Sequence, residues 1–163
     1  MSRIQIMDTK LKIGQKVPAF SVENQREEQI SDQSLLGSKY IVFFYPKDDS
    51  PGCTKQACSV RDNYREIKSY GYRVFGVSPD TVKKHNRFIE KFEFQYELLA
   101  DPDKEMIQNF GVIGPKKFMG REIIGVYRTC FFINEEGIIE HIIDKVVTKK
   151  HGEQILEYLR TTS

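Results

Sequence analysis

The sequence has no tryptophan, only three cysteines and no long apolar run, so several classes of protein are excluded at once. Three cysteines are too few for the disulfide framework of a small secreted domain. The longest apolar run, residues 40–45, is far shorter than the ~20 residues that a membrane-spanning helix needs. Residues 1–17 alternate polar and apolar positions without the apolar centre of a signal peptide. We therefore expect a cytoplasmic protein with reduced thiols and no membrane segment.

The sequence also lacks a charge excess of either sign, since its formal net charge is +2. The basic residues occur as scattered pairs, which argues against a nucleic-acid or anionic-membrane partner. Hydrophobic residues make up 39% and charged residues 29%, which is typical of a soluble globular protein, and 19 Phe and Tyr residues can fill a core. With 163 residues and no linker or internal repeat, we expect one domain over residues 1–163.

The pattern of apolar residues predicts an α/β fold. Residues 40–45 form a continuous β-branched and aromatic run, as in a central strand that is buried on both faces, and the run ends at Pro46. Helical spacing of apolar residues then predicts a helix over 51–70, and residues 72–77 form a second buried strand. Strand, helix and strand together indicate a right-handed crossover between two parallel strands.

The rest of the chain fits the same class. We expect a thioredoxin-like fold, in which helices flank a central mixed five-stranded sheet and an N-terminal β-hairpin precedes it. The remaining expected features are an N-terminal hairpin of strands 19–22 and 29–31, helices that begin at 78–80 and 101–103, a strand at 97–100, a turn at 111–114, strands 126–133 and 138–143, and a final helix at 152–159.

The stretch that carries chemistry is the start of the helix over 51–70. Cys53 lies in its first turn, where free N–H groups and the helix dipole stabilise a thiolate, the nucleophilic form of cysteine. Successive helical residues are rotated by ~100°, so Cys58 lies ~140° around the axis from Cys53. The two thiols do not face each other in an intact helix, and we expect residues 54–56 between them to be exposed.

These residues resemble the signature of the peroxiredoxin family, Pro-x-x-x-Thr/Ser-x-x-Cys, which Pro46, Ser50 and Cys53 match. A second cysteine five positions later, Cys58, is similar to the bacterioferritin comigratory protein, or peroxiredoxin Q, subgroup. The resemblance continues through residues 61–64, 76–80, 99–105 and 125–129, and so covers most of the chain.

The resemblance implies a peroxidase in which Cys53 attacks a hydroperoxide and Cys58 resolves the product as a disulfide. It also implies that Arg128 joins Ser50 in holding the peroxide, that a thioredoxin- or glutaredoxin-like protein is the reductant, and that the protein is a monomer without a cofactor. An arginine suits this role because its guanidinium keeps its charge and offers several donors.

Two positions depart from the family pattern. Ser50 stands where threonine is usual and keeps the hydroxyl. Cys130 stands where threonine is common, two residues after Arg128 and on the same face of the predicted strand. A strand cysteine among aromatic neighbours is usually core packing, although Cys130 stays open as a third redox thiol. The three histidines show no ligand spacing, and we expect surface or packing roles for them.

Two other functions use similar residues. A thiol-disulfide oxidoreductase of thioredoxin type would share the fold class and the helix-start cysteine, but it needs Cys-x-x-Cys, which this sequence lacks. A metal-binding or redox-sensing module without turnover would need more soft ligands than Cys53 and Cys58, since a closed zinc site takes four.

Overall fold

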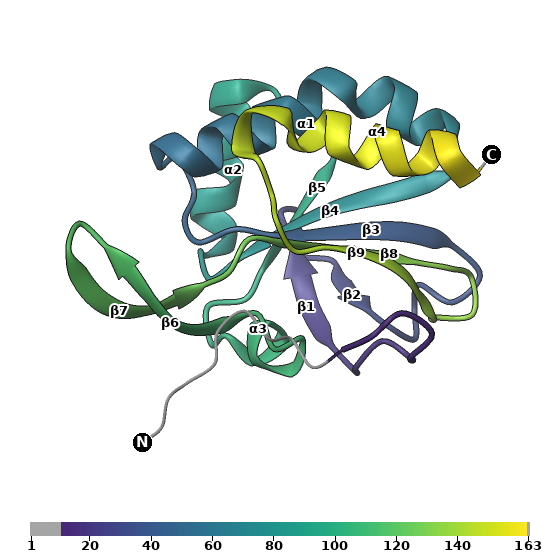
Figure 1. Cartoon of the computed structure of the whole chain (residues 1–163), viewed down its shortest axis with the longest axis horizontal. Helices are drawn as coiled ribbons and strands as arrows, with labels where there is room; N and C mark the ends of the chain where they lie inside the picture. The colour runs from purple at the N-terminus through teal and green to yellow at the C-terminus, as the bar shows by residue number, and fades with distance from the viewer. Residues whose placement is uncertain (1–10, 163) are drawn as a thin grey trace.

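A computed structural model describes residues 11–162, which form a mixed β-sheet with helices on both faces (Figure 1). Residues 1–10, where no signal peptide is expected, and residue 163 lie outside the described part. The main sheet has the strand order β2-β1-β5-β4-β3-β8-β9, and β6 and β7 form a separate pair. The elements are β1 (Ser21–Asn24), β2 (Gln29–Ser31), β3 (Lys39–Phe44), α1 (Pro51–Ser69), β4 (Tyr72–Ser78), α2 (Val82–Phe92), β5 (Glu97–Ala100), α3 (Glu105–Asn109), β6 (Ile113–Phe118), β7 (Arg121–Val126), β8 (Thr129–Ile133), β9 (Ile139–Ile143), the 3-10 turn η1 (Thr148–Lys150) and α4 (His151–Thr162).

The centre of the sheet confirms the predicted crossover. β3 pairs in parallel with β4 and antiparallel with β8, and α1 connects β3 to β4. Every residue of β3 after the first is buried, as expected for a strand that is covered on both faces. The predicted α/β class and thioredoxin-like fold are therefore confirmed, and the helix predicted over 51–70 ends one residue early.

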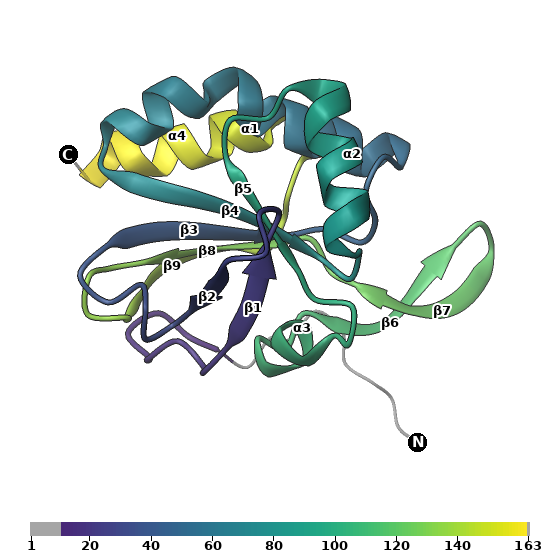
Figure 2. The same cartoon turned by 180° about the vertical axis from the view of Figure 1, so that it is seen from behind.

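Helices cover the two faces of the sheet unequally. α1 and α4 lie side by side over one face, with α2 on the same side, while α3 lies below the other face (Figure 1, Figure 2). Cys53, Ala57 and Val60 of α1 pack into the first layer together with Ile155 and Leu156 of α4. No helix in the described part of the chain is long and apolar enough to cross a membrane.

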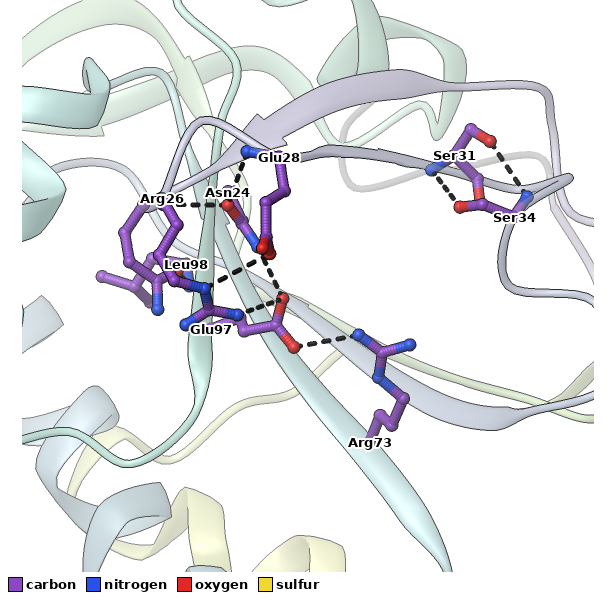
Figure 3. A network of polar contacts seen from close by, with 9 residues as sticks. Asn24, Arg26, Glu28, Ser31, Ser34, Arg73, Glu97 and Leu98 are labelled. Atoms are coloured by element: carbon purple, nitrogen blue, oxygen red, sulfur yellow. Dashed lines mark hydrogen bonds and ion pairs between the residues drawn. The ribbon is translucent and has the colours of Figure 1, made fainter.

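The N-terminal hairpin is part of the main sheet, so the sheet has seven strands where five were predicted. β1 pairs antiparallel with β5, and Asn24 and Glu97 reinforce that junction (Figure 3). Asn24 Nδ2 donates to Glu97 Oε1 over 2.9 Å and to Glu28 Oε1 over 2.8 Å, while Arg73 pairs with the second oxygen of Glu97 at 3.0 Å. The strand predicted at 19–22 lies instead at Ser21–Asn24. Its last residue, Asn24, makes the side-chain contacts that join it to β5.

The second difference is the β6–β7 hairpin, which was not predicted. The turn expected at 111–114 ends before Ile113, where β6 begins, and the strand expected over 126–133 is divided between β7 and β8. This hairpin is a two-stranded ribbon that stands away from the main sheet, and it contains Pro115 and many charged residues. Such a sequence lacks the alternation that marks a strand packed on a core.

A buried hydrogen-bond network holds the loop between β3 and α1. Tyr45 Oη donates to Asp48 Oδ1 over 2.6 Å, and His85 Nδ1 lies 2.7 Å from Asp48 Oδ2. His85 Nε2 lies 2.9 Å from the carbonyl oxygen of Leu99, and because a carbonyl only accepts, this nitrogen carries a hydrogen. Each buried polar atom of this group therefore has a partner, and the loop that leads to α1 is fixed to α2 and β5.

The backbone of the same loop is held as well. The Asp48 N–H donates to Asp80 Oδ2 over 2.7 Å, and Ser78 Oγ donates to that same oxygen over 2.7 Å. We expected surface or packing roles for the histidines, and full burial of His85 and His151 agrees with packing for these two. The spacing of the histidines along the sequence did not reveal these partners, which come from other elements.

Substitution of His85 by leucine should lower the free energy of unfolding by about 1–3 kcal/mol, because the Asp48 carboxylate and the Leu99 carbonyl would each lose a buried partner. Urea denaturation of the two proteins measures this difference. His141→Leu is the control, since His141 lies on the edge strand β9 with its ring stacked on Tyr158. Equal small losses of unfolding free energy in both variants would show that the hydrogen bonds of His85 stabilise the protein no more than the contacts of His141 do.

Candidate active site

Cys53 lies in the first turn of α1, with its sulfur buried against the sheet. The helix begins at Pro51, which suits the first turn because it needs no N–H partner there, and Ser50 before it has an extended backbone. Cys53 is 0% exposed and packs in the layer between α1 and the sheet. The sulfur is thus held at the positive end of a 19-residue helix, as the sequence predicted.

Arg128 brings a fixed positive charge to this sulfur. It lies between β7 and β8, and its Nη1 is 3.2 Å from Cys53 Sγ and 2.8 Å from Gln56 Oε1. The guanidinium keeps its proton at any physiological pH, so the sulfur always faces a cation. Gly52 makes room for this approach, because a Cβ on residue 52 would lie 2.8 Å from Arg128 Nη2.

Gln56 belongs to this site although the sequence pointed elsewhere, to an exposed surface over residues 54–56. Its side chain is 0% exposed and accepts the hydrogen bond from Arg128. The available signal was helical spacing, because a residue three positions after Cys53 lies on the same side of α1. A polar side chain on a helix usually faces solvent, so the residue type alone favoured exposure of Gln56, and only the contact with Arg128 explains its burial.

Ser50 and Pro46 line a cavity next to Arg128. The cavity has a volume of about 350 Å³ and lies between the β3–α1 loop and the β6–β7 hairpin. The Ser50 hydroxyl donates to the carbonyl oxygen of Lys47 over 3.2 Å, so it is engaged with its own loop rather than with the Cys53 sulfur. The remaining walls are largely apolar and include Pro79, Ile113, Phe118, Ile123, Ile124 and Val126.

A second cation, Lys116, reaches the same cavity from β6. Its Nζ donates to the carbonyl oxygen of Val126 over 3.1 Å, and burial together with repulsion from Arg128 lowers its pKa. No sequence pattern singled out Lys116, since it lies in a hairpin that was not predicted. The cavity therefore combines an apolar wall with four basic side chains, Lys47, Lys104, Lys116 and Arg128, of which Arg128 contacts the Cys53 sulfur.

Cys58 lies in the same helix but not beside Cys53. It is half-buried, and burial raises the pKa of its thiol, with Arg61 acting in the opposite direction. Both cysteines are free thiols, and α1 is continuous from Pro51 to Ser69, so the structure represents the reduced form. A disulfide between them would require the helix to change.

Cys130 packs in the core of the same layer, next to β3. It pairs with Phe43 across the sheet and is 0% exposed, and burial raises the pKa of its thiol well above the ordinary value. A thiol that stays protonated is a poor nucleophile. The packing interpretation of Cys130 fits these observations better than a redox role. Among residues 11–162, no three His, Cys, Asp or Glu side chains gather in a way that could hold a metal ion.

Comparison with known proteins agrees with this geometry. Residues 13–142 match the AhpC/TSA family. The chain is 46% identical to a putative peroxiredoxin bcp of Haemophilus influenzae, with 93% of this chain and 97% of the relative covered, and 41% identical to peroxiredoxin Bcp of Escherichia coli, with 92% and 96% covered. It also superposes on the bacterioferritin comigratory protein of Xanthomonas campestris with a TM-score of 0.80 at 28% identity, over 88% of this chain and 91% of that one.

These relatives cover nearly the whole chain as well as nearly the whole of their own length. The family match alone spans most of the described residues and includes Cys53, Cys58 and Arg128. The chain therefore belongs to the AhpC/TSA family, as a thiol peroxidase of the peroxiredoxin type in the bacterioferritin comigratory protein, or peroxiredoxin Q, subgroup.

Proposed function

We propose that this protein reduces hydrogen peroxide and organic hydroperoxides with Cys53 as the nucleophile and Cys58 as the resolving thiol. The observation that carries the proposal is the 3.2 Å contact between Arg128 Nη1 and Cys53 Sγ at the start of α1, beside an open cavity. A cation at this distance stabilises a thiolate more than a neutral thiol. It would also stabilise negative charge on the departing oxygen of a peroxide.

In the first step, the Cys53 thiolate attacks one oxygen of the hydroperoxide and the O–O bond breaks. Cys53 becomes a sulfenic acid, and the other oxygen leaves as an alkoxide or hydroxide that takes up a proton to give an alcohol or water. Arg128 has five N–H donors in a planar fork, so it can hold the sulfur and still offer a donor to the peroxide. Ser50 and Pro46 would form the wall against which the peroxide is held.

In the second step, the Cys58 thiol attacks the sulfenic sulfur, a disulfide forms and water leaves. A dithiol protein of thioredoxin or glutaredoxin type then exchanges with that disulfide, so its own thiols are oxidised and both cysteines are restored. Three cysteines in 163 residues fit a reducing compartment better than a disulfide framework, and we place the cycle in the cytoplasm. A monomer is the form that the subgroup resemblance suggests.

The cavity supports organic substrates as well as hydrogen peroxide. Its apolar wall includes Phe118 and Ile124, whose side chains are 58% and 66% exposed, which is unusual for residues of this size. The Xanthomonas campestris protein is described with an alkyl peroxide reduction activity. An alkyl chain placed against the β6–β7 hairpin would cover these side chains.

The decisive assay couples peroxide consumption to thioredoxin and compares it with reduction of insulin disulfides under the same conditions. Rapid loss of peroxide without insulin reduction supports the peroxidase. Insulin reduction without peroxide loss would favour a thiol-disulfide oxidoreductase, which uses the same fold class.

Replacement of Cys53 by serine should abolish thioredoxin-dependent peroxide turnover, because a hydroxyl is far less nucleophilic than a thiolate at neutral pH.

Cys58→Ser should still permit one oxidation, which leaves Cys53 as a sulfenic acid that is open to over-oxidation. Mass spectrometry of the peroxide-treated variants measures both outcomes. A Cys53–Cys130 disulfide with full turnover in Cys58→Ser would make Cys130 the resolving thiol and refute the role of Cys58.

Formation of the disulfide should unwind the first turns of α1. In an intact helix, residues five apart have Cα atoms about 8.6 Å apart, whereas a disulfide tolerates at most roughly 7 Å. Contacts from outside the helix hold it firmly from Ala57 onward, where Tyr96 Oη donates to the Ala57 carbonyl over 2.6 Å and the Gly152 N–H donates to Ser59 Oγ over 2.9 Å. Before Ala57, the buried polar contacts are those with Arg128, which depend on the position of Cys53.

Hydrogen exchange on the reduced and disulfide forms checks this movement. Amides of residues 54–59 should lose protection on oxidation, because helical hydrogen bonds of that segment break, while amides of residues 72–77 in the central sheet keep theirs. The intact protection of β4 serves as the internal control. Unchanged protection of residues 54–59 in a protein whose Cys53–Cys58 bond has been verified would contradict the unwinding.

The apolar cavity wall can be tested by substrate preference. Ile124→Ser should raise KM for cumene hydroperoxide by roughly fivefold, since one apolar contact is worth about 1 kcal/mol, and should leave the reaction with hydrogen peroxide unchanged. Leu36→Ser is the matched control, because Leu36 is 49% exposed and is not part of the cavity lining. Equal changes for both peroxides would show that Ile124 supports the site without contacting the alkyl group.

A further inference from the structure

Two buried polar atoms, one on α1 and one at the start of α4, have no hydrogen-bond partner among the described residues. They are Nε2 of Gln56 and Nε2 of His151, and both side chains belong to residues that are 0% exposed. A buried polar group without a partner costs about 1–3 kcal/mol, so proteins rarely leave one unpaired. The only other such atom in the described part of the chain is the Tyr40 hydroxyl, which belongs to the core on the opposite face of the sheet.

The neighbours of Gln56 determine which atom of its amide is free. Arg128 Nη1 can only donate, so the amide atom 2.8 Å from it must be the oxygen. The remaining atom, Nε2, is therefore an unpaired donor with two hydrogens. It lies in the same side chain that holds Arg128 beside the Cys53 sulfur.

The neighbours of His151 determine its tautomer in the same way. Gln154 Nε2 donates to the Lys145 carbonyl over 2.9 Å, and Gln154 Oε1 accepts from the Val147 N–H over 3.1 Å, so the orientation of this amide is fixed. His151 Nδ1 lies 3.1 Å from that Oε1, which only accepts, so Nδ1 carries the hydrogen. Nε2 of a neutral His151 is then an unpaired acceptor.

His151 is neutral at physiological pH. Burial lowers the pKa of His151 to about 4, and the charge of Arg128 acts in the same direction, against the hydrogen bond to Gln154. The two free atoms are thus complementary, since Gln56 offers a donor and His151 offers an acceptor. Bulk solvent reaches neither side chain, because both are fully buried.

The packing of α4 against α1 brings the two side chains to the same layer. The N–H of Gly152 donates to Ser59 Oγ, and a Cβ on residue 152 would meet the Ser59 carbonyl oxygen, so the first turn of α4 is pressed against α1. The His151 ring packs edge-on against Phe43, with 5.7 Å between ring centroids, and Phe43 pairs with Cys130, two residues after Arg128. His151 also lies near enough to Arg128 for that charge to act on the ring, and Gln56 is one helical turn before Ser59, on the side of α1 that meets the start of α4.

We propose that His151 is a positioning residue of the peroxidase centre, which holds Gln56 through one buried water molecule between the two Nε2 atoms. The water accepts from Gln56 Nε2 and donates to His151 Nε2, as buried waters do between polar groups that lack other partners. This inference rests on the proposed function. It completes a chain of contacts from His151 through Gln56 and Arg128 to the Cys53 sulfur, and so ties the orientation of the guanidinium to α4.

The first test is spectroscopic and needs no turnover. Nitrogen-15 NMR of the histidine rings at neutral pH should show His151 with a hydrogen on Nδ1 and none on Nε2, and the Nε2 signal should shift when Gln56 is replaced by methionine. A ring with its hydrogen on Nε2, or an Nε2 signal that ignores Gln56→Met, would overturn the proposal.

The second test measures the first oxidation of Cys53 by hydrogen peroxide in a stopped-flow instrument. His151→Phe keeps an aromatic ring against Phe43 but removes the acceptor, and should slow this step about tenfold, less than the ~10²-fold that a 1 Å misplacement costs. His151→Gln, which retains an acceptor, should recover part of the rate. Tyr40→Phe is the matched control, since it removes the other unpaired buried polar atom and should leave the rate unchanged.

A double variant separates positioning from general loss of structure. If His151 acts through Gln56, then His151→Phe combined with Gln56→Met should be no slower than Gln56→Met alone. Additive losses, or equal rates in His151→Phe and the wild-type protein, would overturn the positioning role. A wild-type protein that failed to react with peroxide would instead refute the proposed function, and the NMR test would still decide the contact.

Discussion

A buried thiolate needs a fixed positive partner, and Arg128 Nη1, 3.2 Å from Cys53 Sγ, would meet that requirement in the role that we propose for Cys53. Taking an unpaired charge out of water is so costly that the group would otherwise stay neutral. Arg128 supplies the cation from the short connection between β7 and β8, at the edge of the sheet where β3 ends and α1 begins. Gly52 leaves space for the guanidinium and Gln56 orients it, so two further residues of α1 are determined by the same contact.

The same contact gives α1 two parts with different attachments. From Ala57 onward the helix is bound to the rest of the protein by Tyr96, by the start of α4 and by Arg61, which donates to the Phe92 carbonyl over 2.9 Å. The first turns depend on interactions with the reacting group itself. In the proposed function, oxidation of this sulfur would therefore change the stability of one end of the helix while the other end remains fixed, and a small covalent change would become a local conformational change.

Sequence patterns identified the elements that pack on a core, and they were less informative where function requires exposure. The buried run of β3 and the helical spacing of α1 were sufficient to predict the crossover, because periodic burial is a strong signal. The β6–β7 hairpin was missed because its sequence lacks the alternation of a strand that packs on a core, and Phe118, Ile123 and Ile124 line a cavity. The site residues Cys53 and Arg128 came from a motif and a resemblance, and the structure brings them together. Lys116 and His151 depend on contacts between segments that are distant in the sequence, which no local pattern encodes, whereas for Gln56 the helical spacing from Cys53 was a usable signal.

The β6–β7 hairpin is also prone to aggregation, because it forms a separate two-stranded sheet. Apolar side chains such as Met119 and Ile124 are exposed to solvent. The outer edge of each strand has N–H and C=O groups that no third strand among residues 11–162 pairs. Ribbons of this kind can pair edge to edge and aggregate. The lysines and arginine that interrupt the apolar residues, together with Pro115, oppose such pairing. The charged residues of this hairpin thus oppose aggregation of a protein whose exposed apolar residues lie next to the cavity beside Arg128.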